Sequence, residues 1–266
     1  MINPLANNEI PIYSKLAHVY DRLMSNVDYE TWADYIDEII DIHHPQATRL
    51  LEMACGTGSI AISLDELGYY DILATDLSPD MIAKAKLKAD ESICEVSFRT
   101  MNFMDIDLKE TFDVVFMVFD SINYLHTEED ILKLHAEVRK VLRPGGYFIF
   151  DFTTPRNSRK AIRQLHREEG ISRDKKYRYF RTSSFDGNSN IHTNKFEIEK
   201  SGEVNGSTTE NFVEIHRQKI YTFDQMMRIL LKTGYQIEKA YDGFTFEDAN
   251  NKSLRITVVA QCQKMQ

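Results

Sequence analysis

Short apolar runs alternate with amphipathic segments along the first half of the chain. Apolar residues recur at helical spacing from Tyr29 to Ile42, which predicts an amphipathic helix. Strands are expected after it at residues 50–53, 71–76, 95–99, 114–119 and 147–152. The run from Val114 to Phe119 has no polar alternation, which is typical of a central parallel strand covered on both faces. This β-α alternation predicts a parallel sheet with right-handed crossovers.

The helices between these strands carry their own start signals. Ser78 and Pro79 supply an N-cap and an N1 proline for a helix that runs to about Ala89. Thr127 and Asp130 form a capping pair for a second helix. These caps place the helix starts directly after strands, as a β-α unit requires.

The periodicity changes after Pro155. Strands are expected at residues 177–185, 190–199 and 208–221, with turns at 186–187 and 201–206. The first two alternate apolar and polar side chains around Asp186 and Gly187, which is a hairpin signal. Residues 156–220 are therefore predicted to form an antiparallel insertion over the carboxyl edge of the main sheet.

The α/β pattern resumes at Thr222, which with Gln225 caps a helix to Gly234, and strands are expected at residues 235–241 and 254–261. The fold class that follows is α/β. It consists of a seven-stranded, mostly parallel sheet with helices on both faces, and an antiparallel β insertion after the fifth strand.

Composition and charge argue against several classes of function. The formal net charge of -9 argues against nucleic acid as a partner, because a phosphate backbone would be repelled on average. The longest apolar run is far shorter than the ~20 residues of a membrane helix, and Met1 to Pro4 lack the layout of a signal peptide. The 3 cysteines are widely spaced, so a reduced, cytoplasmic location and no metal site are expected.

The segment from Leu50 to Gly58 carries the most chemical information. An apolar strand ends in an acid, Glu52, and runs straight into a turn of small residues that would let a ligand approach the backbone. In an open α/β sheet, this turn lies at the carboxyl edge where ligands bind. Asp76 ends the next strand, where its carboxylate can accept both hydroxyl protons of a ribose. A nucleoside ligand is implied.

Two nucleoside cofactors fit this segment. Gly56, Gly58 and Ala61 satisfy the G-x-G-x-x-A pattern of nicotinamide dinucleotide sites. Glu52, however, would repel a pyrophosphate, whereas it can face an ammonium group. The acid therefore favours S-adenosylmethionine over a nicotinamide dinucleotide.

With these residues the chain resembles the class I S-adenosylmethionine-dependent methyltransferases, which have a Rossmann-like fold. The similarity is to the small-molecule branch with glycine and sarcosine N-methyltransferases and aminosugar N,N-dimethyltransferases. The motifs that carry it are Glu52–Gly58, Asp76–Ser78, Met101–Phe103, Phe119–Tyr124 and Leu142–Gly146. The resemblance spans residues 13–153 and 221–262 and implies S-adenosylmethionine as cofactor.

The resemblance also implies roles for single residues. The cofactor-binding residues that it implies are Tyr20, Glu52, Ala54, Cys55, Gly56, Gly58, Asp76, Leu77, Asn102, Phe103, Phe119 and Asp120. Glu52 and the turn would hold the methionine part, Asp76 and Leu77 the ribose and adenine, and Asn102 and Phe103 would border the adenine. Many relatives have glycine at the position of Ala54 and aspartate at that of Asn102.

Three residues are candidates for catalysis. Tyr20 lies in a segment, Tyr13 to Leu23, that resembles the N-terminal lid of the family. Tyr124 follows the central strand, where the methyl group should point, and His126 could remove a proton from the acceptor. A basic, aromatic stretch that includes Arg181 could bind an acidic acceptor or could be a solvated strand face.

Residues 1–155 and 221–266 are thus expected to form the S-adenosylmethionine-binding domain with its lid helix, and residues 156–220 a substrate-covering insertion. The function expected is methyl transfer to a small soluble acceptor, at nitrogen or oxygen, by in-line displacement. Alternatives are an RNA or nucleobase methyltransferase, a nicotinamide-dependent oxidoreductase, or a non-catalytic S-adenosylmethionine-binding module. The insertion could instead pair with a second copy to form a homodimer.

Overall fold

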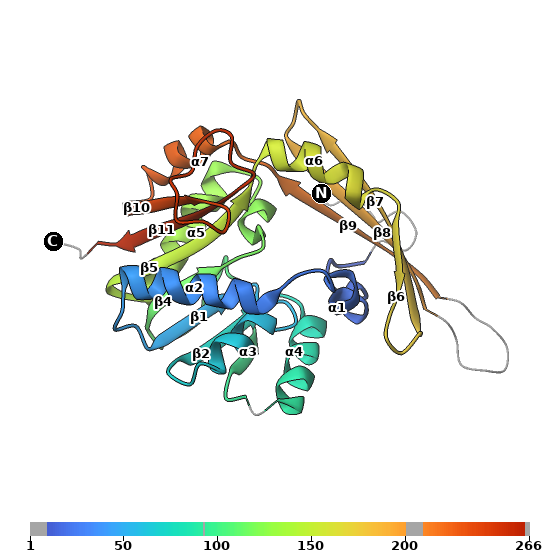
Figure 1. Ribbon diagram of the computed structural model, residues 1–266, viewed down its shortest axis with the longest axis horizontal. Helices are drawn as coiled ribbons and strands as arrows, with labels where there is room; N and C mark the ends of the chain where they lie inside the picture. The colour runs from blue at the N-terminus through green and yellow to red at the C-terminus, as the bar shows by residue number, and fades with distance from the viewer. Residues whose placement is uncertain (1–9, 93, 201–209, 264–266) are drawn as a thin grey trace.

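The computed structural model describes residues 10–92, 94–200 and 210–263, which form two separate sheets. The main sheet contains β1 (Arg49–Met53), β2 (Asp71–Asp76), β3 (Ser97–Thr100), β4 (Phe112–Met117), β5 (Leu142–Thr153), β10 (Tyr235–Asp242) and β11 (Arg255–Cys262). Their order is β10-β11-β5-β4-β1-β2-β3, and only the pairings of β11 with β10 and with β5 are antiparallel (Figure 1). The predicted seven-stranded, mostly parallel sheet is confirmed.

Helices cover both faces of this sheet, as the uninterrupted apolar run in its centre requires. They are α2 (Tyr29–His43), α3 (Ser59–Asp65), α4 (Pro79–Glu91), α5 (Glu128–Val141) and α7 (Phe223–Leu230). Val114 and Phe116 pack with α2, α3 and α4, whereas Val115 and Met117 pack with α5 and α7 on the opposite face. The predicted caps at Ser78, Thr127 and Thr222 are all present.

Several strand ends differ from the prediction, and two of them lie in the centre of the main sheet. The central strand was expected to reach Phe119 but ends at Met117, because Phe119 and Asp120 both have positive φ and turn the chain out of the sheet. The fifth strand was expected to begin at Tyr147 but begins at Leu142, which pairs with Phe112 across an irregular register. The residues between Leu142 and Tyr147 therefore form a bulge within the strand.

The insertion begins with a helix that the sequence pattern did not predict. It consists of α6 (Pro155–Leu165), β6 (Glu168–Ile171), β7 (Tyr177–Asp186), β8 (Ile191–Lys200) and β9 (Glu210–Lys219). The strands form one antiparallel sheet in the order β6-β7-β8-β9, with the predicted hairpin between β7 and β8. Only Pro155 and Ser158 of α6 are buried, and most of its other residues are polar or charged. The predicted turn at 201–206 lies outside the described residues.

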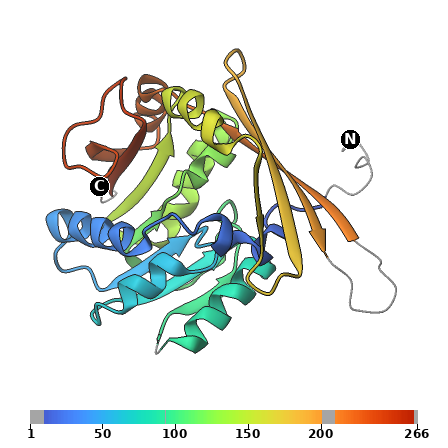
Figure 2. The ribbon, with the colours of Figure 1, turned by 45° about the vertical axis from the view of Figure 1, so that its right-hand side comes forward.

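The two sheets face each other across the N-terminal segment. Figures 1 and 2 show this segment, with η1 (Leu16–His18) and α1 (Tyr20–Leu23), between the main sheet and the second sheet. Leu16 and Val19 pack against Tyr177, Tyr179 and other apolar side chains of the second sheet. The N-terminal segment thus lies between the two sheets and helps to connect them.

A buried ion pair fixes the turn after β4. Arg255 on β11 bonds to Asp151 on β5 and, at 2.6 Å, to Asp120 in the turn. Asp151 also accepts the backbone N–H of Asp120 at 2.7 Å. Burial raises the pKa of Asp151 to about 6, although the charge of Arg255 opposes this rise. This network holds Phe119 and Asp120 in their left-handed conformation.

Replacing Arg255 with methionine should therefore leave the buried Asp151 and the partly buried Asp120 without their cation. We expect Arg255→Met to lower the free energy of unfolding by about 3–5 kcal/mol near pH 7.5, as measured by urea denaturation. The pKa of Asp151 lies above its unfolded value, so the folded protein binds this proton first as the pH falls through about 6. Lowering the pH therefore favours the folded state here, and it neutralises the carboxylate that Arg255→Met leaves without its cation. The decrease in the free energy of unfolding caused by this substitution should therefore be smaller at about pH 5.5 than near pH 7.5. The exposed Arg163→Met serves as control. Equal stability of Arg255→Met and wild type at both pH values would contradict this role.

Candidate active site

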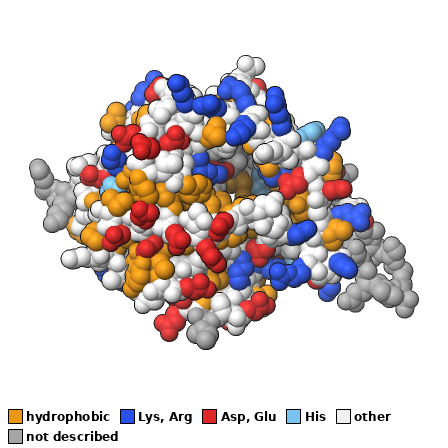
Figure 3. All heavy atoms as spheres, viewed as in Figure 1, with side chains coloured by type: hydrophobic (Ala, Val, Ile, Leu, Met, Phe, Trp, Pro, Cys, Tyr) orange, Lys and Arg blue, Asp and Glu red, His pale blue; other side chains and the backbone are white. Residues whose placement is uncertain are grey.

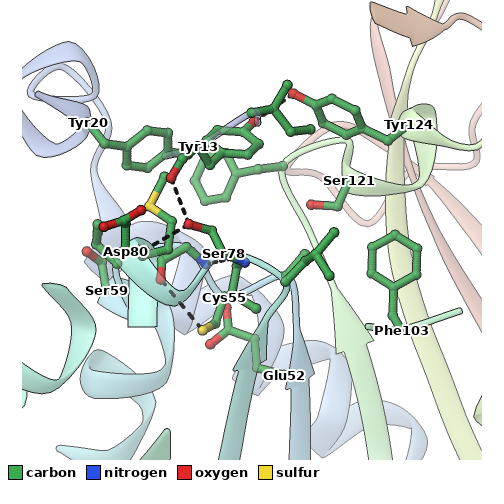
Figure 4. A pocket seen from close by; sticks show the side chains of 18 of the residues that line it. Tyr13, Tyr20, Glu52, Cys55, Ser59, Ser78, Asp80, Phe103, Ser121 and Tyr124 are labelled. Carbon is green, nitrogen blue, oxygen red and sulfur yellow. Dashed lines mark hydrogen bonds between the residues drawn. The ribbon is translucent and has the colours of Figure 1, made fainter. Parts of the chain in front are cut away.

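A cavity of about 350 Å³ lies at the carboxyl ends of β1 and β2. The predicted cofactor residues that line it are Tyr20, Glu52, Ala54, Cys55, Gly56, Asp76, Leu77, Phe103 and Phe119, together with the predicted catalytic residue Tyr124. Figure 4 shows Glu52 at the floor of this cavity and Tyr13, Tyr20 and Tyr124 across its top. The strand order thus brings together residues that are far apart in the sequence.

The turn after β1 is shaped by positive backbone angles. Ala54, Gly56 and Gly58 have φ of 56°, 57° and 75°, respectively. A Cβ at Gly58 would lie 2.6 Å from the ring of Phe98, so a larger residue would not fit there. The tight turn directs the backbone N–H of Gly56 at Asp76 Oδ2, 2.9 Å away. The small residues therefore connect the end of β1 to the acid at the end of β2.

Asp76 is held in place by the backbone around it. Its second oxygen accepts the N–H of Ser78 at 2.8 Å. Burial raises the pKa of Asp76, and the backbone hydrogen bonds partly counteract this effect. Asp76 lines the cavity, and each carboxylate oxygen can accept a second hydrogen bond, so this side chain can bind the hydroxyl groups of a ligand.

Glu52 has a different environment. It is buried, and its Oε2 atom has no hydrogen-bond partner among the described residues. Burial raises the pKa of this carboxyl well above its usual range. An unpaired buried carboxylate is costly, so it favours a cationic ligand group beside it. The ammonium group of an amino acid fits this requirement.

The N-terminal segment forms the top of the cavity and is tied to both sheets. Ser78 Oγ donates to the carbonyl of Tyr13 at 2.7 Å. On the other side, the buried Glu214 of β9 accepts the backbone N–H groups of Tyr13, Lys15 and Leu16 at 2.7, 2.7 and 2.9 Å. The segment was expected to act as a lid helix, and it contains only short helical turns.

A second cavity of about 420 Å³ lies between the insertion, the N-terminal segment and the loop after β4. Figure 3 shows the molecular surface hollowed between the two sheets, with hydrophobic side chains at the rim of the hollow. Four aromatic residues line both cavities, namely Tyr13, Tyr20, Phe119 and Tyr124. In the insertion sheet, the sequence pointed only to the basic, aromatic stretch that includes Arg181 as a possible acceptor-binding surface, and Arg181 lines this cavity.

The polar lining of the second cavity comes from several elements. Its polar and charged residues include Asp120, Ser158, Arg181, His192, Asn194, His216, Gln218 and Arg255. Arg181 bonds to Asn194 and Glu168 at 3.1 and 3.2 Å. Ser158 is buried, and its hydroxyl has no hydrogen-bond partner among the described residues. These groups can recognise a polar molecule.

Four of the predicted site residues do not line the first cavity. Asp120 lines the second one, where Arg255 and Gln218 bond to its carboxylate at 2.6 Å each. Gly58 is the N-cap of α3. Asn102 accepts the backbone N–H of Met104 at 2.9 Å. His126 lines neither cavity and bonds to the carbonyl of Arg217 at 2.9 Å.

The described ranges contain neither a metal-binding cluster nor a membrane-spanning helix. No group of three or more His, Cys, Asp or Glu side chains there is arranged to hold a metal ion. None of the helices in that part of the chain has the length and apolar character to cross a bilayer.

Comparison with known proteins agrees with this geometry. Residues 50–146 match the family described as "Methyltransferase domain". YqeM of Bacillus subtilis (strain 168), a protein named as a methyltransferase, is 30% identical over 262 residues, or 95% of this chain and 98% of that protein. The glycine/sarcosine N-methyltransferase of Parasynechococcus marenigrum (strain WH8102) is 26% identical over 249 residues, or 86% and 83%.

A solved structure shows the same fold over nearly the whole chain. It is an S-adenosylmethionine-dependent methyltransferase from Clostridium acetobutylicum ATCC 824, with a TM-score of 0.74 at 24% identity, covering 96% of this chain and all of that one. Together with the family match and the relationship to YqeM, this places the chain in a known group. The protein belongs to the class I S-adenosylmethionine-dependent methyltransferases, in the branch that includes glycine/sarcosine N-methyltransferase.

Proposed function

We propose that the protein methylates a small amine that binds in the second cavity while S-adenosylmethionine occupies the first. The observation that carries this proposal is the shared wall of Tyr13, Tyr20, Phe119 and Tyr124. A methyl group that passes from one ligand to the other must cross at this wall, because each ligand has its own cavity.

The first cavity fits the cofactor through the two buried acids. The unpaired carboxylate of Glu52 would face the ammonium group, and Asp76 would accept the ribose hydroxyl groups. Leu77 and Phe103 supply apolar surface for the adenine. When bound, the cofactor supplies a methyl group on a positively charged sulfur. The chain's own part is to orient the two reactants and exclude water, which contributes several orders of magnitude in rate.

The charged groups around the second cavity are compatible with an amine as acceptor. One carboxylate, Asp120, and two guanidinium groups, those of Arg181 and Arg255, line this cavity. Arg255 is paired with both Asp120 and Asp151, and Arg181 is paired with Glu168. Both arginines are therefore already neutralised, and counted with these partners the group holds three carboxylates and two guanidinium groups, which favours a cationic acceptor over an acidic one. The name of the relative from Parasynechococcus, a glycine/sarcosine N-methyltransferase, agrees with an amine.

The basic stretch of β7 gives less support to an acidic acceptor. Arg181 lines the second cavity, whereas Arg173 and Arg178 lie along a separate open groove with Lys84 and Lys88 of α4. Two of the three arginines are therefore directed away from the reacting centre.

The function is tested by incubating the protein and S-adenosylmethionine with a panel of small amines, small alcohols and a transcribed RNA. We expect S-adenosylhomocysteine to form with at least one amine, above the rate without acceptor. Turnover with the RNA alone would favour the nucleic-acid alternative. Cofactor binding without turnover of any compound in the panel would favour a non-catalytic binding module.

Replacing Glu52 with glutamine should weaken cofactor binding, because the ammonium group loses its charged partner. A hydrogen bond to a charged group is worth about 1.5–3 kcal/mol, so Kd should rise about 10- to 150-fold in calorimetry. The exposed Glu66→Gln, at the end of α3, is the control and should bind as wild type does. Unchanged affinity in Glu52→Gln would reject the assigned orientation of the cofactor.

Filling the second cavity should weaken the binding of the acceptor and leave the binding of the cofactor unchanged. Ala161 of α6 lines this cavity, so Ala161→Phe should raise KM for the amine found in the screen at least about tenfold, the factor that ~1.4 kcal/mol of lost binding gives. The Kd for S-adenosylmethionine should stay within about threefold. Lys160→Phe places the same side chain on the exposed face of the helix and should leave KM unchanged. A cofactor defect in Ala161→Phe, with normal KM, would argue against two separate cavities.

A further inference from the structure

A chain of four polar side chains runs from the shared wall into the second sheet. The hydroxyl groups of Tyr13 and Tyr124 are 2.7 Å apart, and Tyr124 Oη lies 2.9 Å from His216 Nδ1. His216 Nε2 lies 3.3 Å from Oε2 of Glu214. His216 and Glu214 are both buried and lie two residues apart on the same face of β9. The chain therefore links the reacting centre to an enclosed carboxylate.

The hydrogen-bonding capacities of these groups give the chain a direction. An ionised carboxylate only accepts, so His216 Nε2 donates to Glu214. The neutral imidazole then has a lone pair on Nδ1, which accepts the hydroxyl proton of Tyr124. The oxygen of Tyr124 accepts the hydroxyl proton of Tyr13 and has a second lone pair for another donor.

We infer that His216, acting through Tyr124, is the base that removes a proton from a protonated amine bound in the second cavity. The inference rests on the proposed function. One N–H proton of the ammonium group moves to Tyr124 Oη while the hydroxyl proton of Tyr124 moves to His216 Nδ1. The products of this step are a neutral amine, whose nitrogen has regained its lone pair, and an imidazolium ion beside the Glu214 carboxylate.

The chemistry of amines creates the need for this step. An aliphatic amine has a pKa near that of lysine, about 10.4, so it is almost fully protonated at neutral pH. An ammonium nitrogen has no lone pair with which to attack a methyl group. Once the N-terminal segment covers the site, bulk water is a poor proton acceptor, and an internal base is required.

The surroundings of His216 favour it over the other histidine of the cavity. His216 bonds to Tyr124 of η2 (Ser121–Tyr124) and to Glu214 on its own strand. The ring of Tyr13 packs edge-on against its imidazole, with centroids 4.6 Å apart, and Arg181 of β7 lines the same cavity. Glu214 is the group placed to stabilise an imidazolium. His192 bonds instead to the hydroxyl of Ser183 at 2.8 Å, and burial lowers its pKa.

The direction of the hydrogen bonds can be tested without an acceptor. In the full chain labelled with ¹⁵N-histidine, the His216 signal is assigned by its loss in His216→Gln. We expect the tautomer with the proton on Nε2, and a shift of the Nδ1 signal in Tyr124→Phe. A proton on Nδ1 would reverse the direction of the chain and overturn the inference.

The base itself is tested by the dependence of the rate on pH, with the amine found in the screen. His216→Gln and Tyr124→Phe should each lower kcat about 100-fold near neutral pH. The deficit should shrink as the pH rises, because solution then supplies the free amine. The Kd for S-adenosylmethionine should stay within about threefold. His166→Gln, in the same insertion and outside both cavities, is the matched control.

Two results would overturn the role of His216. One is a deficit in His216→Gln that is constant with pH, which indicates a positioning role only. The other is a wild-type rate in that variant at neutral pH. If wild type turns over no amine, the proposed function fails and the base role fails with it, whereas the tautomer measurement still decides the order of the hydrogen bonds.

Discussion

The site depends on one buried carboxylate, that of Glu214 in β9. Its two oxygens accept three backbone N–H groups of the N-terminal segment and face the imidazole of His216. These bonds compensate for taking a charge out of water, and they hold Tyr13 at a positive φ of 58°, which a tyrosine rarely adopts. Without this carboxylate, mainly apolar contacts, such as those of Leu16 and Val19, would hold the roof of the cofactor cavity to the second sheet. The backbone of Tyr13 would then lose its hydrogen bond to β9, and the wall between the two cavities would lose the support that this bond gives to Tyr13.

The sequence alone was sufficient for the main sheet and for the cofactor. Strand and helix periods are local signals, and the acid–small-residue turn from Glu52 to Gly58 lies within a few residues. The helix α6 was missed because most of its residues are polar or charged, and its only apolar residues besides Pro155 are Ala161, Ile162 and Leu165. Positive φ at Phe119 and Asp120 depends on Arg255, which lies 135 residues further along the chain.

Contacts between residues that are distant in the sequence also explain why Glu214 and His216 were not predicted as site residues. The alternation along β9 places Glu214 and His216 on one face, and this much is readable from the sequence. Their partners, however, are Tyr13 and Tyr124, which lie 201 residues before Glu214 and 92 residues before His216. No local pattern reports such contacts. His126 was selected because it is close to Tyr124 in sequence, yet its ring bonds to the backbone of Arg217.

The residues of the shared wall come from outside the insertion, which affects how such enzymes can change their acceptor in evolution. Tyr13 and Tyr20 belong to the N-terminal segment, and Phe119 and Tyr124 to the loop after β4, so no residue of the insertion belongs to the wall. Apart from Glu214 and His216, which support the wall, the insertion supplies the far side of the second cavity. This remaining surface can therefore accumulate substitutions and acquire a new selectivity without disturbing the place where the methyl group crosses. Evolution can change what is methylated while the machinery of transfer is inherited unaltered.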